Sequence, residues 1–169
     1  MADMAASVLA RLKNKAKESD ADIIPVFRSD GSGTTFVFTD YLSKVSENWK
    51  NTYGTGKSVN FPKGQAAKGN PGVAGVISQT ANSIGYVGSE YAFAQRIPYA
   101  TLMNVNGELV KPTSESISAA ASGDIPSDTR TSITNSSAKG AYPISCFTWI
   151  LIYKEQAYAK RSAEQAQAT

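Results

Sequence analysis

One short segment combines residue types that suit the binding of an oxyanion such as phosphate, namely Arg28-Ser29-Asp30-Gly31-Ser32-Gly33-Thr34. Its two glycines allow the backbone to approach a ligand closely, and Ser32 and Thr34 add hydroxyl donors. Arg28 carries a planar, permanently charged guanidinium that matches two oxygens of a phosphate or carboxylate. Asp30 would repel an anion unless it pairs with Arg28 and fixes the orientation of the guanidinium. We therefore interpret this segment as a candidate anion-binding loop.

The same residues also fit an ordinary surface turn. Serine, aspartate and glycine are common turn residues, and an arginine beside a turn is often only a surface charge. The spacing is not that of a P-loop, because no lysine follows the second glycine, and it is not a dinucleotide fingerprint. Judged by residue types alone, the turn is the stronger interpretation.

The composition limits the classes of function that remain. The chain has 169 residues, of which 41% are apolar and 18% charged, as expected for one globular domain. It contains no histidine, the commonest general base and metal ligand. Its single cysteine, Cys146, lies in an apolar run and is expected to be a small buried side chain. We therefore predict that the chain is not an enzyme and that it needs neither a cofactor nor a metal.

Charge and hydropathy bear on partners and location. The net charge of +3 is modest, and the basic residues form no stripe with interleaved aromatics, so we expect no nucleic-acid partner. No stretch is long and apolar enough to predict a membrane span, and the N-terminus lacks the pattern of a secretory signal. The sequence as written therefore predicts a soluble chain, either cytoplasmic or the mature or engineered form of an exported protein.

Strand and helix patterns alternate along the chain, which predicts a single α/β domain with a central mixed, largely parallel sheet flanked by helices. The candidate loop follows the first expected strand and precedes a helix, where ligands bind in open α/β sheets and where helix amides attract anions. The expected strands are 23–27, 58–61, 83–87, 99–105, 131–134 and 144–153, with 109–110 pairing back across a turn at Asn106-Gly107. The expected helices are 1–18, 34–44, 47–53, one starting with a capping Asn70, then 90–95, 114–121 and 154–168; 64–69 is expected to be a second loop.

Several strings, in family order, resemble the phosphate-binding proteins of bacterial high-affinity phosphate ABC transporters. This resemblance runs from about residue 22 to residue 156, and its strings together are specific. Members of that family are two-domain clamshells of the periplasmic binding protein kind, so the resemblance implies a division into 1–19, 20–156 as a second domain, and 157–169. The strings are 28–42, 68–70, 72–75, 83–87 and 142–144 with 147–149.

The resemblance implies phosphate binding and a set of site residues. Arg28, Ser32, Gly33 and Thr34 would be the phosphate contacts of the second domain, and Asp30 would orient the arginine. The remaining family contacts come from a first domain, so we expect half of a site, with weak and salt-sensitive binding of phosphate or sulfate. A first-domain chain or a second copy could complete it. The family partner is an ABC transporter permease, and the family location is the periplasm or cell surface.

Two alternatives to this function stay open. The chain could be an isolated or engineered structural domain that oligomerises and binds little ligand, since the segments 1–19 and 157–169 do not resemble the family. A phosphatase-like enzyme is a weaker alternative, because no histidine is present. In the second loop, Gln65-Ala66-Ala67 stands where the family tends to have glycines, which questions the role of that loop, and Lys68 fits a solvated lysine better than a second anion contact.

Overall fold

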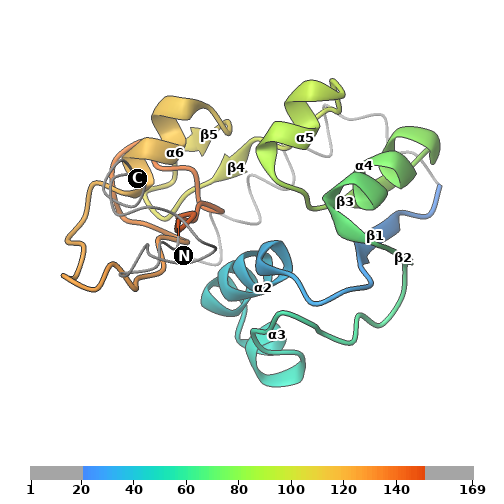
Figure 1. Ribbon diagram of the computed structural model, residues 1–169, viewed down its shortest axis with the longest axis horizontal. Coiled ribbons are helices and arrows are strands. Elements are labelled where there is room, and N and C mark those ends of the chain that lie inside the picture. The colour runs from blue at the N-terminus through green and yellow to red at the C-terminus, as the bar shows by residue number, and fades with distance from the viewer. Residues whose placement is uncertain (1–20, 151–169) are drawn as a thin grey trace, which may run out of the picture.

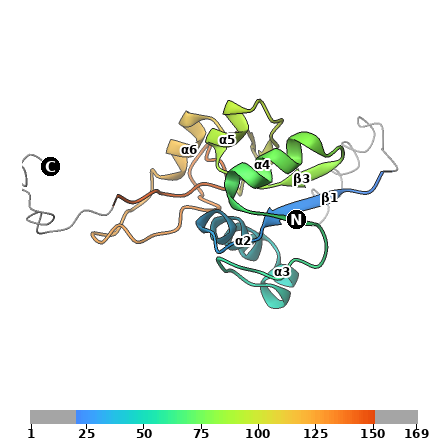
Figure 2. The same ribbon diagram turned by 45° about the vertical axis from the view of Figure 1, so that its right-hand side comes forward.

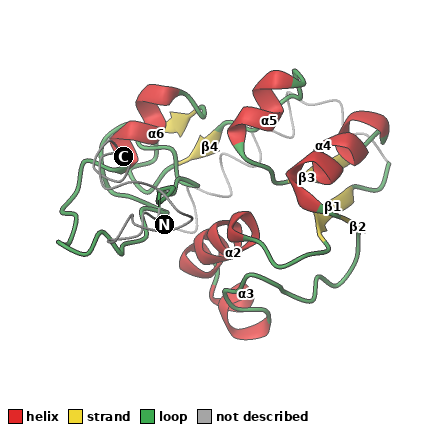
Figure 3. Cartoon of the chain, viewed as in Figure 1, coloured by secondary structure: helices red, strands yellow, loops and turns green. Residues whose placement is uncertain are grey.

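The computed structural model describes residues 21–150, so the helices predicted at 1–18 and 154–168 lie outside the described residues. The described part is an α/β fold in which strands alternate with helices (Figure 3). The elements are β1 (Ile24–Arg28), α2 (Gly33–Val45), α3 (Glu47–Thr52), β2 (Gln65–Ala67), α4 (Gly69–Gln79), β3 (Ser83–Gly85), α5 (Ser89–Ala94), β4 (Leu102–Met103), β5 (Leu109–Val110) and α6 (Ser114–Ala120).

The main sheet has three parallel strands in the order β2-β1-β3 (Figure 1). Arg28 at the end of β1 pairs with Ala67 at the end of β2, and Val26 pairs with Gly85 at the end of β3. All three carboxyl ends therefore meet at one edge. The predicted α/β class is confirmed, and the antiparallel strands β4 and β5 form a separate two-stranded sheet joined through the predicted turn at Asn106-Gly107.

Helices cover both faces of the main sheet, with α4 and α5 above it and α2 and α3 below it in Figure 2. On the α4 side, Val26 of β1 packs with Ala67 of β2 and Val73 of α4, and the exposed fraction of Val73 is 0%. A second buried cluster joins Ala74 of α4 to α5 and the chain that follows it. Burial of such aliphatic side chains drives the folding of this layer.

Aromatic rings fill the other side of the sheet. Side chains alternate along a strand, so Phe27 points away from the face that Val26 occupies. The ring of Phe27 stacks on Phe61 at a centroid distance of 4.6 Å, and Phe38 of α2 stacks on Tyr86 at 4.5 Å. These rings fix α2 and the segment 53–64 against the sheet.

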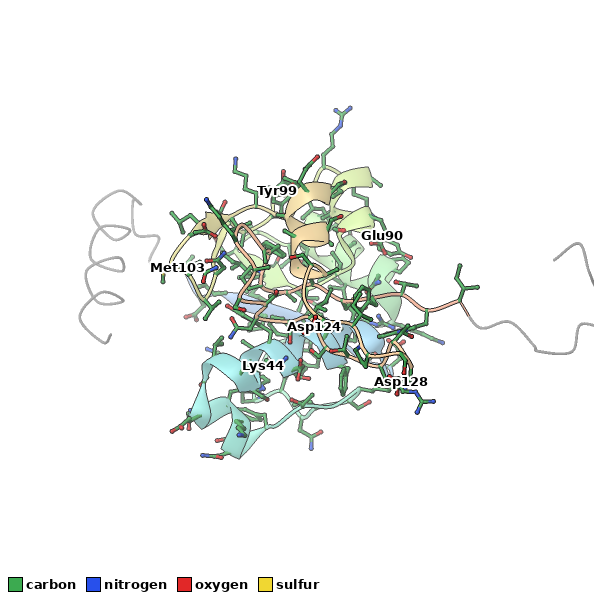
Figure 4. All side chains as sticks on the ribbon, turned by 90° about the vertical axis from the view of Figure 1, so that its left-hand side faces the viewer. Lys44, Glu90, Tyr99, Met103, Asp124 and Asp128 are labelled. Carbon is green, nitrogen blue, oxygen red and sulfur yellow. The ribbon has the colours of Figure 1, made fainter. Side chains whose placement is uncertain are left out.

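Helix α2 also holds the long segment after α6, since residues 121–150 contain neither helix nor strand. Asp40 and Lys44 form an ion pair of 3.1 Å, and both bond Ser132 and Thr134. Partial burial raises the pKa of Asp40, but the hydrogen bonds from Thr134, Ser132 and Lys44 outweigh it and keep that pKa below its usual range. Figure 4 labels Lys44 on α2 and, in the segment it anchors, Asp124.

Three strand predictions were wrong. Residues 58–61 are not a strand, because Phe61 stacks on the ring of Phe27 and so packs on a face of the sheet instead of pairing at its edge. The edge strand β2 lies instead within the segment predicted to be a loop. Residues 131–134 are not a strand, because Thr134 is buried by hydrogen bonds to α2. The described part of 144–153 is not a strand, and of its residues only Ser145 is buried, whereas Ile150 is 86% exposed and Cys146 is exposed rather than buried.

A substitution at Gly85 of β3 tests the packing of the main sheet. A Cβ atom at this position would lie 2.7 Å from the carbonyl oxygen of Val26, whereas a Cβ at Gly75 in α4 meets nothing within 4 Å. We expect Gly85→Ala to lower the free energy of unfolding by about 1–3 kcal/mol through overpacking. The control Gly75→Ala should raise it by about 0.5–1 kcal/mol, since alanine favours helix. Urea unfolding measures both, and equal effects would contradict the packing described.

Candidate functional site

The candidate loop lies at the edge where the three parallel strands end. Arg28 is the last residue of β1, Gly69 and Asn70 follow β2 at the start of α4, and Tyr86 follows β3. The amide of Ser29 extends the pairing of β1 and β2 by donating to the carbonyl of Ala67 at 3.0 Å. Parallel topology thus brings polar groups from three distant parts of the chain to one place.

Arg28 and Asp30 form a two-point ion pair at this edge. Nε of Arg28 donates to Oδ1 of Asp30 at 2.8 Å, and Nη2 donates to Oδ2 at 2.5 Å. The arginine side chain is 11% exposed and the aspartate side chain 33%. The hydrogen bond from Arg28 holds the pKa of Asp30 well below its usual range, and the Gly69 amide, 2.9 Å from Oδ1, adds to that effect. The pairing that the sequence suggested is present in the structure.

Asn70 accepts hydrogen bonds from two residues of the candidate loop. Its Oδ1 lies 3.0 Å from Nη1 of Arg28 and 3.3 Å from Oγ1 of Thr34. A guanidinium has five N–H groups, and Asp30 and Asn70 take three of them. One N–H on Nη1 and one on Nη2 therefore have no acceptor among the described residues and can bond a ligand.

Helix α2 begins within the loop and contributes backbone donors. Ser32 is its N-cap, with φ −141° and an Oγ that accepts the amide of Thr35 at 3.2 Å. Ser32 is only 4% exposed, and its own amide donates to the carbonyl of Lys57. The amides of Gly33 and Thr34 have no acceptor within residues 21–150. They are the free donors of a helix N-terminus, which carries a partial positive charge.

Tyr86 joins the start of α2 to the end of β1. Its hydroxyl accepts the amide of Arg28 at 3.3 Å and lies 2.8 Å from Oγ1 of Thr35, a side chain that is 1% exposed. The stacking of its ring on Phe38 fixes the hydroxyl. Tyr86 thus holds the backbone of Arg28, and Asn70 holds its side chain, both from outside the loop.

Sequence reasoning identified the loop but missed the groups that support it. Asn70 was predicted to cap a helix, which is wrong: Lys68 is the N-cap of α4 without a side-chain bond, and Asn70 lies in the first turn. Tyr86 lies in the string 83–87 of the family resemblance, but no role at the site was predicted for it. Position could have indicated Tyr86, which lies in the strand predicted at 83–87, but not Asn70, because the strand β2 before it was not predicted. Lys68 is exposed, as expected of a solvated lysine.

A metal site and a membrane span are two further features that the described residues could form. Among residues 21–150, no group of three or more histidine, cysteine, aspartate or glutamate side chains is placed to hold a metal ion. None of the helices in this range combines the length and apolar character that a membrane crossing requires. The arrangement at the strand ends can bind an anion through directed N–H and O–H groups.

Comparison with known proteins agrees with this chemistry. A family model described as a PBP superfamily domain matches residues 5–168. The chain is 44% identical over 149 residues to the phosphate-binding protein PstS of Pasteurella multocida, covering 86% of this chain and 43% of that protein. It is 41% identical over 160 residues to the phosphate-binding protein PstS of Methanocaldococcus jannaschii, covering 86% and 41%.

A third relative is the phosphate-binding protein PstS of Xylella fastidiosa (strain Temecula1), 44% identical over 153 residues, which covers 89% of this chain and 41% of that protein. The chain thus spans about two fifths of the length of the curated relatives it matches. The matched range includes most of 1–19 and 157–169, which lie outside the described residues, and the division at 19 and 157 stays a prediction.

The hydrogen bonds of the Tyr86 hydroxyl can be tested by removing that hydroxyl. Tyr86→Phe leaves the amide of Arg28 and the buried Oγ1 of Thr35 without a partner, so we expect the free energy of unfolding to fall by about 1–3 kcal/mol. Amide hydrogen exchange at Arg28 should also accelerate. Tyr99→Phe is the control, because Tyr99 is exposed and its hydroxyl has no bond among the described residues. An unchanged exchange rate at Arg28 would contradict the contact.

The ionisation of Asp30 is a second test. An ordinary aspartate titrates with a pKa of about 3.9, and we expect the Asp30 carboxylate to stay ionised through that range. Because the pKa of Asp30 is lowered in the folded state, the ion pair stabilises the protein fully at pH values above the ordinary pKa of an aspartate. This stabilisation is lost only as the pH falls through the lowered pKa of Asp30. Carbon-detected NMR of the carboxyl groups measures this. In Arg28→Ala, Asp30 should titrate closer to 3.9; ordinary titration in the parent would refute the pair.

Proposed function

The chain belongs to the PBP superfamily, and on this basis we propose that its described domain binds phosphate through residues 28–34. The observation that carries the proposal is the juxtaposition of two unpaired amides at the start of α2 with an oriented arginine that has two unpaired N–H groups. A tetrahedral oxyanion has four acceptor oxygens, which these donors can bond. The relatives named phosphate-binding protein PstS support phosphate as the anion.

Each predicted site residue has a place in this proposal. Arg28 directs its free N–H groups to two anion oxygens, while Gly33 and Thr34 donate their amides. Ser32 can donate its hydroxyl hydrogen, which has no acceptor among the described residues, while its oxygen accepts the amide of Thr35. Asp30 orients the arginine. No atom of this set forms or breaks a covalent bond, so the proposed role is binding and release.

The setting of the loop limits the affinity that these residues can supply alone. Gly33 is exposed and Thr34 is half-buried, so their donors compete with water. Exposed ionic contacts are weak and are screened by salt. We propose that groups outside the described residues complete the site, from a further domain, a partner chain or a second copy. Sulfate, which has the same shape, is the expected competitor.

We further propose that the chain acts in phosphate uptake as a substrate-binding component that delivers phosphate to an ABC transporter permease. The likeness to proteins named phosphate-binding protein PstS supports this role, and we propose with it that the working protein acts outside the cytoplasmic membrane. A scaffold without ligand binding is the alternative, and the two differ in one measurement, the affinity for phosphate.

Calorimetric titration of the full chain with phosphate at low ionic strength tests the proposal. We expect measurable binding that weakens as salt is added, and a loss of at least about tenfold in Arg28→Ala because a charge-assisted contact disappears. Arg28→Lys should also bind poorly, since an ammonium cannot bond Asp30, Asn70 and the anion in one plane. Arg130→Ala is the control, removing the same charge from an exposed arginine.

The outcomes separate the alternatives. Equal binding by Arg28→Ala and Arg130→Ala would show that phosphate responds only to net charge and would overturn the assigned site. An absence of binding in the parent protein, at all phosphate concentrations, would favour the scaffold.

A further inference from the structure

We propose that Asn70 is a positioning residue of the anion site, and that it must be neutral to serve in this way. Its role in holding Arg28 and Thr34 is inferred from geometry, and its effect on ligand affinity rests on the proposed function. The string 68–70 of the family resemblance contains Asn70, but neither that string nor the candidate loop assigned it such a role.

The contacts of Asn70 join three elements. One amide oxygen has two lone pairs, and Oδ1 of Asn70 uses them for Nη1 of Arg28 at the end of β1 and for Oγ1 of Thr34 in the first turn of α2. Asn70 itself lies in the first turn of α4 and is half-buried. Because Val73 and Ala74 of α4 are fully buried, this end of the helix has little freedom to move. The asparagine therefore holds the side chains of Arg28 and Thr34 in fixed positions relative to α4.

The arginine needs this second anchor. Asp30 holds the edge formed by Nε and Nη2, while Asn70 holds Nη1. Together they leave one free N–H on each terminal nitrogen. Without Asn70, Nη1 would have no partner among the described residues, and the guanidinium could rotate about its Nε–Cζ bond more readily. A donor pair that is already oriented loses less freedom when it binds an anion.

The neutral amide preserves the local charge balance. Arg28 and Asp30 sum to zero, and Asn70 adds nothing. An aspartate at position 70 could accept the same two hydrogen bonds, but it would leave this cluster with a net charge of −1. Coulomb repulsion of a dianion by a half-buried carboxylate is much stronger than in bulk water. Asparagine is thus the residue of this shape that orients the arginine without opposing the ligand.

Two variants separate positioning from charge. Asn70→Ala removes the acceptor, and Asn70→Asp keeps the acceptor but adds a negative charge. Asn51→Ala and Asn51→Asp are the matched controls, because Asn51 is exposed on α3 and its side chain has no hydrogen bond among the described residues. The measurements on the full chain are the phosphate dissociation constant at two ionic strengths and the NMR exchange rate of the Arg28 Nη groups without phosphate. Urea unfolding checks that each variant is folded.

We expect Asn70→Ala to accelerate rotation of the Arg28 guanidinium and to weaken phosphate binding about tenfold. Asn70→Asp should keep rotation slow yet bind phosphate at least about tenfold more weakly, with the deficit shrinking as salt screens the repulsion. Both Asn51 variants should match the parent in rotation rate and stay within about twofold in affinity.

The outcomes distinguish this inference from the proposed function. Faster Arg28 rotation in Asn70→Ala, with no phosphate binding in the parent, would support positioning while the proposed function fails. Phosphate binding in the parent, with rotation and affinity unchanged in Asn70→Ala, would overturn positioning and leave the proposed function intact. Parent-like affinity in Asn70→Asp would overturn the requirement for neutrality, and this variant remains informative if Asn70→Ala does not fold.

Discussion

An arginine whose side chain is only 11% exposed requires a counter-charge, and the pairing of Arg28 with Asp30 supplies one two residues away. This ion pair organises the rest of the carboxyl edge of the sheet. The Gly69 amide bonds the aspartate, Asn70 bonds the arginine side chain, and Tyr86 bonds the arginine backbone. Removing one charge would leave the other without its partner, a costly state for partly buried groups. The loop is therefore held by a network that spans three strand ends.

The same pairing determines how the loop can attract an anion. A neutral pair contributes little long-range field, so attraction depends on short-range donors: the free N–H groups of Arg28 and the amides of Gly33 and Thr34. The partial positive charge at the start of α2 acts in the same direction. In the proposed site, such donors would distinguish anions by the placement of their oxygens more than by their total charge. That property would suit the proposed phosphate-binding role, in which one oxyanion is selected and released.

Sequence patterns predicted the elements whose signals are local. The starts of α2, α3 and α6 were predicted to within one residue, and Ser32, Ser46 and Thr113 cap them through side-chain bonds. Strand β2 could not be predicted, because it has only three residues and Gly64 before it, at φ +127°, lies against the carbonyl of Pro25. The contacts of Thr134 with α2 are likewise tertiary. The candidate anion-binding loop was recognisable because its residues are contiguous, whereas Asn70 and Tyr86 reach it only through the fold.

The dependence on tertiary contacts also explains why the site is built around α4. Strands β2 and β3 have three residues each, too few to fix the groups that follow them by ladder hydrogen bonds alone. Helix α4 connects these strands, packs on all three strands of the main sheet, and begins with the two residues that bond the ion pair. Its buried Val73 lies in the same cluster as Val26 of β1, two residues before Arg28. The hydrophobic layer and the polar edge therefore share one rigid unit, so that packing under α4 sets the geometry of the donors at the end of β1.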